Sequence, residues 1–235
     1  MIKSMNLEEI CKNYLLQVSS YEHMESAASF QEFPFTLTSH QFLAFANKDL
    51  ESNGEHGLVN ALTNAKRAID CQVDAILNTF GIKKKRSFPA KMEQFAELGM
   101  IAPRILNRII RLRNYLEHEY VLPDQERVED AVDTATLFIA VTDRVYRMFT
   151  NYIAIGRDDN HEDLDVALDV RYEIGQQKIQ LCIQVNFEEV FNQTYDSSQP
   201  EYMPTIKLLM EIDYQNSSIS EVQAVQNFVA SVLGK

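Results

Sequence analysis

The spacing of apolar residues changes once along the chain, and this change most limits how the chain can fold. Between residues 57 and 80, apolar side chains recur every three or four positions, the pattern of an amphipathic helix of about six turns. Similar spacing continues to about residue 153, interrupted at Pro89, Pro103 and Pro123. After residue 164, apolar and polar residues alternate, which is typical of half-buried strands. The sequence therefore predicts helices followed by a sheet.

We accordingly expect an α+β protein that is predominantly α, in three parts. Residues 1–56 would form an N-terminal helical arm, and residues 57–153 a four-helix bundle. Residues 164–235 would form a β-β-β-α domain, with a small antiparallel three-stranded sheet and a C-terminal helix. The helices predicted before this domain span 5–20, 39–51, 57–80, 89–99, 103–120 and 125–153. The predicted strands span 165–174, 179–187 and 206–214.

The charge balance limits which partners the whole surface can attract. The chain has 34 acidic and 22 basic side chains, a net charge of −12, so its surface as a whole repels nucleic acid and anionic membranes. Any nucleic-acid site must therefore be local. The N-terminus carries acids where a signal peptide needs an apolar core, and no apolar run is long enough to cross a membrane. We expect a cytoplasmic protein with no membrane partner.

The sequence predicts neither a metal site nor a cofactor. Cys11, Cys71 and Cys182 lie far apart without a CxxC pair, which is typical of reduced cytosolic thiols. The acidic segment 157–163 lacks the glycine and the terminal glutamate of a calcium-binding hand. No histidine has a zinc-ligand partner at suitable spacing, and no glycine-rich phosphate loop is present.

Basic residues gather in one region of this acidic chain. Between Lys83 and Arg113 there are nine basic side chains and only two acidic ones. In the helix that begins after Pro103, polar and cationic residues share the face opposite Ile109 and Leu112. A local cationic surface of this kind attracts a phosphate backbone. The residues predicted to bind RNA are Lys83, Lys84, Lys85, Arg86, Arg104, Arg108 and Arg111.

The end of the same helix carries a recognisable motif. The string Arg113-Asn114-Tyr-Leu-Glu-His118-Glu-Tyr120 resembles the signature of HEPN domains (higher eukaryotes and prokaryotes nucleotide-binding). The resemblance covers about residues 57–153, with the motif near the end of the third of four helices. Competent members of that family are metal-independent ribonucleases that act as dimers, several of them toxins of toxin-antitoxin or phage-defence systems. The resemblance implies a HEPN-like four-helix bundle, with Arg113 and His118 as the catalytic pair and Asn114 supporting them.

These residue types suit RNA cleavage without a metal. An imidazole such as that of His118 can give or take a proton near neutral pH, and the guanidinium of Arg113 is a permanent cation that fits phosphate oxygens. On an unbroken helix the two side chains point about 140° apart, so they must meet at the helix end or across a two-fold axis. We therefore expect a homodimer. In one HEPN branch a tyrosine matching Tyr120 is modified with AMP by a partner nucleotidyltransferase antitoxin, which makes Tyr120 a candidate modification site.

Simpler interpretations of the same residues stay open. Arg113 can pair with Glu117 one turn away, His118 can be a cation at a helix C-terminus, and Tyr120 can be a buried tyrosine. The main alternative function is a non-catalytic HEPN-like module that binds a protein or nucleotide partner. A further alternative places the function in the C-terminal domain, with the bundle serving only to dimerise.

Overall fold

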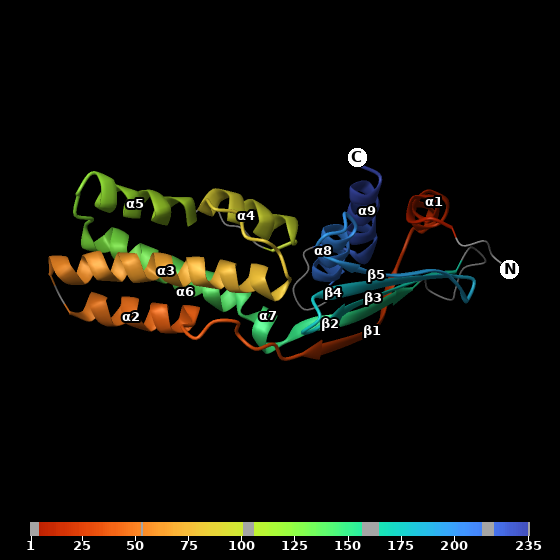
Figure 1. Ribbon diagram of the computed structural model, residues 1–235, viewed down its shortest axis with the longest axis horizontal. Helices are drawn as coiled ribbons and strands as arrows, with labels where there is room; N and C mark the ends of the chain where they lie inside the picture. Colours follow the sequence, from red (N-terminus) through yellow and green to blue (C-terminus); the bar gives the residue numbers. More distant parts are fainter. Residues whose placement is uncertain (1–4, 53, 101–105, 157–164, 213–218, 235) are drawn as a thin grey trace. The chain divides into compact units, whose positions relative to one another are not determined.

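The computed structural model describes residues 5–52, 54–100, 106–156, 165–212 and 219–234 (Figure 1). The side chains of Arg113, Tyr115 and Glu117, and the acidic segment 157–163, lie outside this description. The chain divides into two compact units. The sheet unit comprises Met1–Gln31, Glu97–Gly99 and Met148–Lys235, and the helical unit comprises Glu32–Ala96 and Met100–Arg147.

The sheet unit is built on an antiparallel sheet whose five strands follow chain order from edge to edge. Alternate residues of the two central strands are buried, such as Leu168 and Val170 on one and Leu181 and Ile183 on the other. This alternation directs one face of the sheet into the core. The strands are β1 (Glu22–Ser29), β2 (Phe149–Gly156), β3 (Val166–Glu173), β4 (Lys178–Val185) and β5 (Glu188–Asp196).

Helices cover the apolar face of the sheet. Helix α8 (Tyr202–Ile212) packs on β2, β3 and β4, and α9 (Glu221–Val232) packs on α8. The short N-terminal helix α1 (Leu7–Asn13) and the 3-10 turn Leu15–Gln17 pack against α9. The core of this unit therefore lies between the sheet and the α8–α9 pair.

The helical unit is organised around its longest helix, α3. Helix α3 contacts α2, α5 and α6 (Figure 1). It approaches α2 closely at Gly57, where a Cβ atom would lie 2.5 Å from the carbonyl oxygen of Asp49. The helices are α2 (Ser39–Glu51), α3 (Glu55–Thr79), α4 (Phe88–Glu97), α5 (Leu106–His118), α6 (Gln125–Thr142) and α7 (Arg144–Arg147).

A buried hydrogen-bond chain joins three of these helices. The Ser39 hydroxyl of α2 donates to Gln72 Oε1 of α3 at 2.6 Å. Gln72 Nε2 donates to Thr142 Oγ1 of α6 at 3.1 Å, and that hydroxyl donates to the carbonyl oxygen of Phe138 at 2.8 Å. Ser39 and Gln72 are fully buried. Because a buried polar group without a partner is costly, this chain fixes how α2, α3 and α6 align.

Several predicted elements are confirmed. The helices predicted at 39–51 and 57–80 correspond to α2 and α3, and the final helix corresponds to α9. The predicted hairpin at 165–187 is formed by β3 and β4, which pair antiparallel. None of the described helices combines the length and the apolar character needed to cross a membrane.

The predicted fold class is wrong in its sheet and in its bundle. The structure has a five-stranded sheet and a helical unit built from α2 to α7. The prediction was a three-stranded sheet and a HEPN-like four-helix bundle. The third predicted strand, 206–214, falls on α8. That helix is buried on nearly every side, with Ile206, Leu208, Leu209 and Met210 all in the core. When a helix is buried on all sides, its apolar residues no longer recur every three or four positions. The alternation of apolar residues in this segment therefore did not indicate a strand.

The other errors concern strands β1, β2 and β5. The helix predicted at 125–153 ends at Thr142, and its last residues form β2 between β1 and β3. The helix predicted at 5–20 is formed only in part, as α1 and the 3-10 turn, and β1 follows it. Strand β1 is almost wholly exposed, and β5 is largely so. Edge strands of this kind show little apolar alternation. Whether such a segment forms a strand depends on the strand with which it pairs.

We expect that replacing Gln72 with methionine lowers the free energy of unfolding by about 1–3 kcal/mol. The change leaves the buried Ser39 hydroxyl without its acceptor. The measurement is urea denaturation followed by circular dichroism. The control is the Ser39→Ala/Gln72→Met double variant, which removes both partners and is expected to recover part of the loss. A double variant less stable than the single one by the full cost of Ser39→Ala would contradict the buried-partner explanation.

We also expect all three free thiols to react slowly with iodoacetamide at pH 9 in the folded protein. Burial raises the pKa of Cys11 to about 12 and that of Cys71 to about 11. Burial and the hydrogen bond to Glu189 raise the pKa of Cys182 to about 12. Only the thiolate reacts, so alkylation measured by mass spectrometry should be much faster in urea.

The raised thiol pKa values also predict a pH dependence of stability. The unfolded chain releases these protons near the ordinary value of 9.0, whereas the folded chain holds them. Their contribution to stability is therefore complete below pH 9 and is lost as the pH rises toward 12. Native alkylation at the rate of the urea-unfolded chain would contradict both expectations.

Candidate functional site

The polar face predicted on the motif helix is exposed in the structure. Leu106 and Ile109 of α5 are buried, which fixes which side of the helix faces the core. The other side is open to solvent, as the helical spacing predicts. The exposed residues on it are Asn107, Arg108, Arg111, Asn114 and His118.

Three of these residues form one small site at the C-terminal end of α5. Arg111, Asn114 and His118 follow one another at spacings of three and four, so they lie one turn apart on one face. With Glu119 they line a hollow of about 200 Å³. Within the described part of the chain, His118 forms no ion pair. The hollow thus offers a guanidinium, an amide, an imidazole and a carboxylate to a ligand from solvent.

Not every predicted site residue is placed. The backbone of Arg113 belongs to α5, but its side chain lies outside the described residues, as does all of Arg104. The expected approach of Arg113 to His118 and the alternative pairing of Arg113 with Glu117 therefore both stay predictions. His118 occupies the last turn of α5, a position where the helix dipole also favours a cation.

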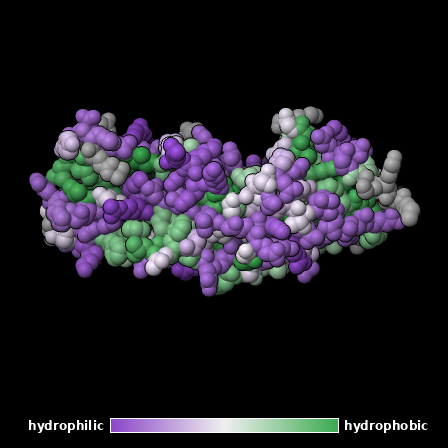
Figure 2. All heavy atoms as spheres, viewed as in Figure 1, coloured by the Kyte–Doolittle hydropathy of each residue, from purple (hydrophilic) through white to green (hydrophobic). Residues whose placement is uncertain are grey.

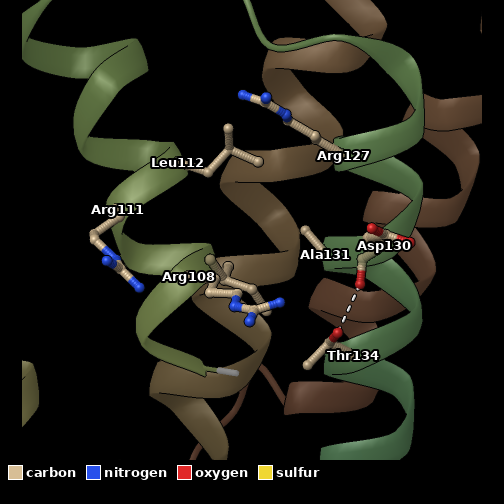
Figure 3. A pocket seen from close by; sticks show the side chains of 8 residues that line it. Arg108, Arg111, Leu112, Arg127, Asp130, Ala131 and Thr134 are labelled. Atoms are coloured by element: carbon tan, nitrogen blue, oxygen red, sulfur yellow. Dashed lines mark hydrogen bonds between the residues drawn. The ribbon is translucent and has the colours of Figure 1, made fainter. Parts of the chain in front are cut away.

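A larger groove lies beside this hollow, between α5 and α6 (Figure 3). Its volume is about 430 Å³. Arg111 lines both the groove and the hollow, so the two adjoin. The remaining residues of the groove lining are Arg108, Ile109, Leu112, Arg127, Asp130, Ala131 and Thr134.

The basic loop at 83–86 lies elsewhere. It connects α3 to α4, at the end of the helical unit opposite to the one where α5 ends (Figure 1). Lys84 pairs with Asp74 at 3.2 Å, and Lys85 pairs with Glu93 at 3.9 Å. Lys91 contacts the same Asp74 at 2.6 Å. The structure therefore does not bring this loop together with His118, and acids already neutralise part of its charge.

The segment after the motif is exposed and partly apolar. Tyr120 is 88% exposed and has a backbone φ of 55°, a left-handed conformation that few non-glycine residues adopt. The interpretation of Tyr120 as a buried tyrosine is therefore wrong. Val121 and Leu122 are 55% and 40% exposed. Apolar residues are visible on the surface at this end of the helical unit in Figure 2.

Sequence reasoning missed Arg127. It lies in the first turn of α6, after the N-cap Asp124. No motif or cluster of basic residues surrounds Arg127 in the sequence, so nothing there indicated a site. Arg127 reaches the groove that Arg108 lines only because α5 and α6 both pack against α3. Within the described part of the chain, no group of three or more His, Cys, Asp or Glu side chains is arranged to hold a metal ion.

Comparisons with protein-family models, with curated proteins and with solved structures found no significant match to this chain. The site must therefore be interpreted from its own residues and geometry.

We expect that replacing Gln94 with alanine loosens the basic loop. Gln94 is buried, accepts from the Lys85 backbone N–H at 2.9 Å and donates to the Lys83 carbonyl oxygen at 2.9 Å. Without this clamp the loop backbone opens more often, so trypsin should cleave within residues 83–86 several times faster. Fragment masses over time measure this. Gln125→Ala, which removes an exposed amide from α6, is the control, and equal cleavage of both variants would show that Gln94 does not restrain the loop.

Proposed function

We propose that this protein is a metal-independent endoribonuclease of the HEPN type. The observation that carries the proposal is the exposed hollow at the end of α5, which Arg111, Asn114 and His118 line together. Two of these residues belong to the HEPN-like motif, and the third adds a cation beside them. The proposed catalytic residues are Arg113, Asn114 and His118.

The groups in the hollow match the requirements of the reaction. A base removes the proton of the ribose 2′-hydroxyl, whose oxygen attacks the neighbouring phosphorus. The bond from phosphorus to the 5′-oxygen breaks, an acid protonates that oxygen, and the products carry a 2′,3′-cyclic phosphate and a 5′-hydroxyl. His118 supplies proton transfer, and the amide of Asn114 lies one turn away, where it can orient the ring once RNA is bound. Guanidinium groups stabilise the negative charge on the phosphoryl oxygens.

One imidazole cannot serve as base and acid in the same step, and this supports a homodimer. Two copies that meet at the ends of their α5 helices would supply two imidazoles to one cleft. The exposed Val121 and Leu122 directly after the motif provide apolar surface for such a contact. The proposed setting is the cytoplasm.

The proposed biological role is that of a toxin or phage-defence effector. The exposure of Tyr120 leaves its hydroxyl accessible to a cognate nucleotidyltransferase antitoxin. A genomic neighbour that encodes such an enzyme would support this role.

A non-catalytic binding module is the second candidate function. The pairing of Lys84 and Lys85 with acidic side chains favours it, because these cations are then less available to RNA. In this alternative the exposed surface of α5 binds a protein or nucleotide partner, and no RNA is cut. A cleavage experiment therefore separates the two.

We expect purified protein to cleave mixed single-stranded RNA in EDTA, and His118→Ala to be slower by at least about 100-fold. Gel electrophoresis measures the rates, and mass spectrometry identifies the cyclic phosphate ends. His40→Ala removes an exposed histidine at the start of α2 and should retain the parental rate. Cleavage that persists in His118→Ala would remove His118 from the mechanism, and cleavage by none of the proteins would favour the binding module.

A further inference from the structure

We infer that the groove between α5 and α6 holds the RNA strand next to the bond that is cut, with Arg108 and Arg127 contacting its phosphates. This inference rests on the proposed function, because it assigns the reacting phosphate to the adjoining hollow. It adds Arg127, a residue outside the motif and outside the basic segment 83–113, to the binding surface.

The two arginines approach the groove from opposite walls. Figure 3 shows Arg108 extending from α5 toward α6 and Arg127 extending from α6 toward α5. Leu112 lies between them, and Ile109 and Ala131, both buried, complete an apolar floor. A groove with guanidinium groups above an apolar floor suits a nucleotide, whose phosphates are anionic and whose sugar and base present apolar faces.

The charge of the groove favours an anion. Three arginines line it, and Asp130 is the one carboxylate among its lining residues. Within the described part of the chain, Arg108 and Arg111 form no ion pair. Arg127 pairs with Asp124 at 3.1 Å, but both side chains are more than half exposed. Exposed pairs of this kind contribute little, so a phosphate can replace Asp124 as the partner of Arg127.

The position of the groove next to the hollow indicates that the ligand is an RNA strand. Arg111 lines both the groove and the hollow that contains His118, so one ligand can occupy the two together. From Arg108 to His118, α5 extends about 15 Å, a length that a few nucleotides cover. A mononucleotide would fill only one of the two spaces. A single RNA strand therefore fits better than a free nucleotide.

The experiment measures RNA binding apart from cleavage. All variants carry His118→Ala, and fluorescence anisotropy with a 5′-labelled single-stranded RNA in EDTA gives Kd as a function of KCl. Arg108→Gln/Arg127→Gln should weaken binding by at least about tenfold at low salt. It should also reduce the slope of log Kd against log salt by about 1.4, or about 0.7 for each phosphate that the protein no longer neutralises.

The control removes the same charge elsewhere on the helical unit. Lys48→Gln/Arg67→Gln changes two exposed cations of α2 and α3 and should leave Kd within about twofold. Arg108→Lys/Arg127→Lys keeps the charge and should restore most of the salt slope, which a folding defect would not allow. Equal Kd values for the glutamine variant and the control would overturn the inference.

The outcomes separate this inference from the proposed function. If the parent protein cleaves RNA while Arg108→Gln/Arg127→Gln binds as well as the control, the inference fails and the function stands. If the parent does not cleave but the glutamine variant alone loses affinity and slope, the function fails and the groove remains an RNA-binding site. Displacement of the strand by AMP at the same nucleotide concentration as by unlabelled RNA would indicate a mononucleotide site and overturn the inference.

Discussion

The burial of α3 is the constraint on which the helical unit depends. This helix carries the apolar stripe that packs against α2, α5 and α6, and its Gln72 links α2 to α6 inside the core. Because α5 and α6 both pack on α3, their outward surfaces lie beside each other. The groove and the hollow are therefore consequences of core packing, although none of the described side chains that line them belongs to α3.

Charge is distributed so that a local cationic site can exist on an acidic protein. The lysines of the basic loop lie beside Asp74 and Glu93, and these carboxylates reduce the positive charge that the loop can offer to RNA. Arg108 and Arg111 have no such partners within the described residues. Both line the groove, and Arg111 also lines the hollow that contains His118. In the proposed ribonuclease, the net charge of −12 would repel RNA from the rest of the surface and leave α5 as the place of contact.

The accuracy of the sequence predictions depended on how each segment is buried. Segments with one apolar face, such as α2, α3 and the β3–β4 hairpin, were predicted correctly because their period is visible locally. Helix α8 was taken for a strand because it is buried on nearly all sides, although Lys207 and Glu211 already stood at the spacing of a helical ion pair. Strands β1 and β2 pair with each other from distant parts of the chain, which no local pattern reports. Strand β5 pairs with its chain neighbour β4, but it is an exposed edge strand with little apolar alternation.

The sequence by itself determined the polar face of α5, because helical periodicity fixes which residues lie opposite Ile109 and Leu112. It also determined the spacing of Asn114 and His118 within the motif. Only the tertiary structure decided that Arg127 lies across a groove from Arg108, and that the basic loop lies at the other end of the unit. Both outcomes follow from how separate helices pack, and such contacts join residues whose distance along the chain carries no information about their distance in space.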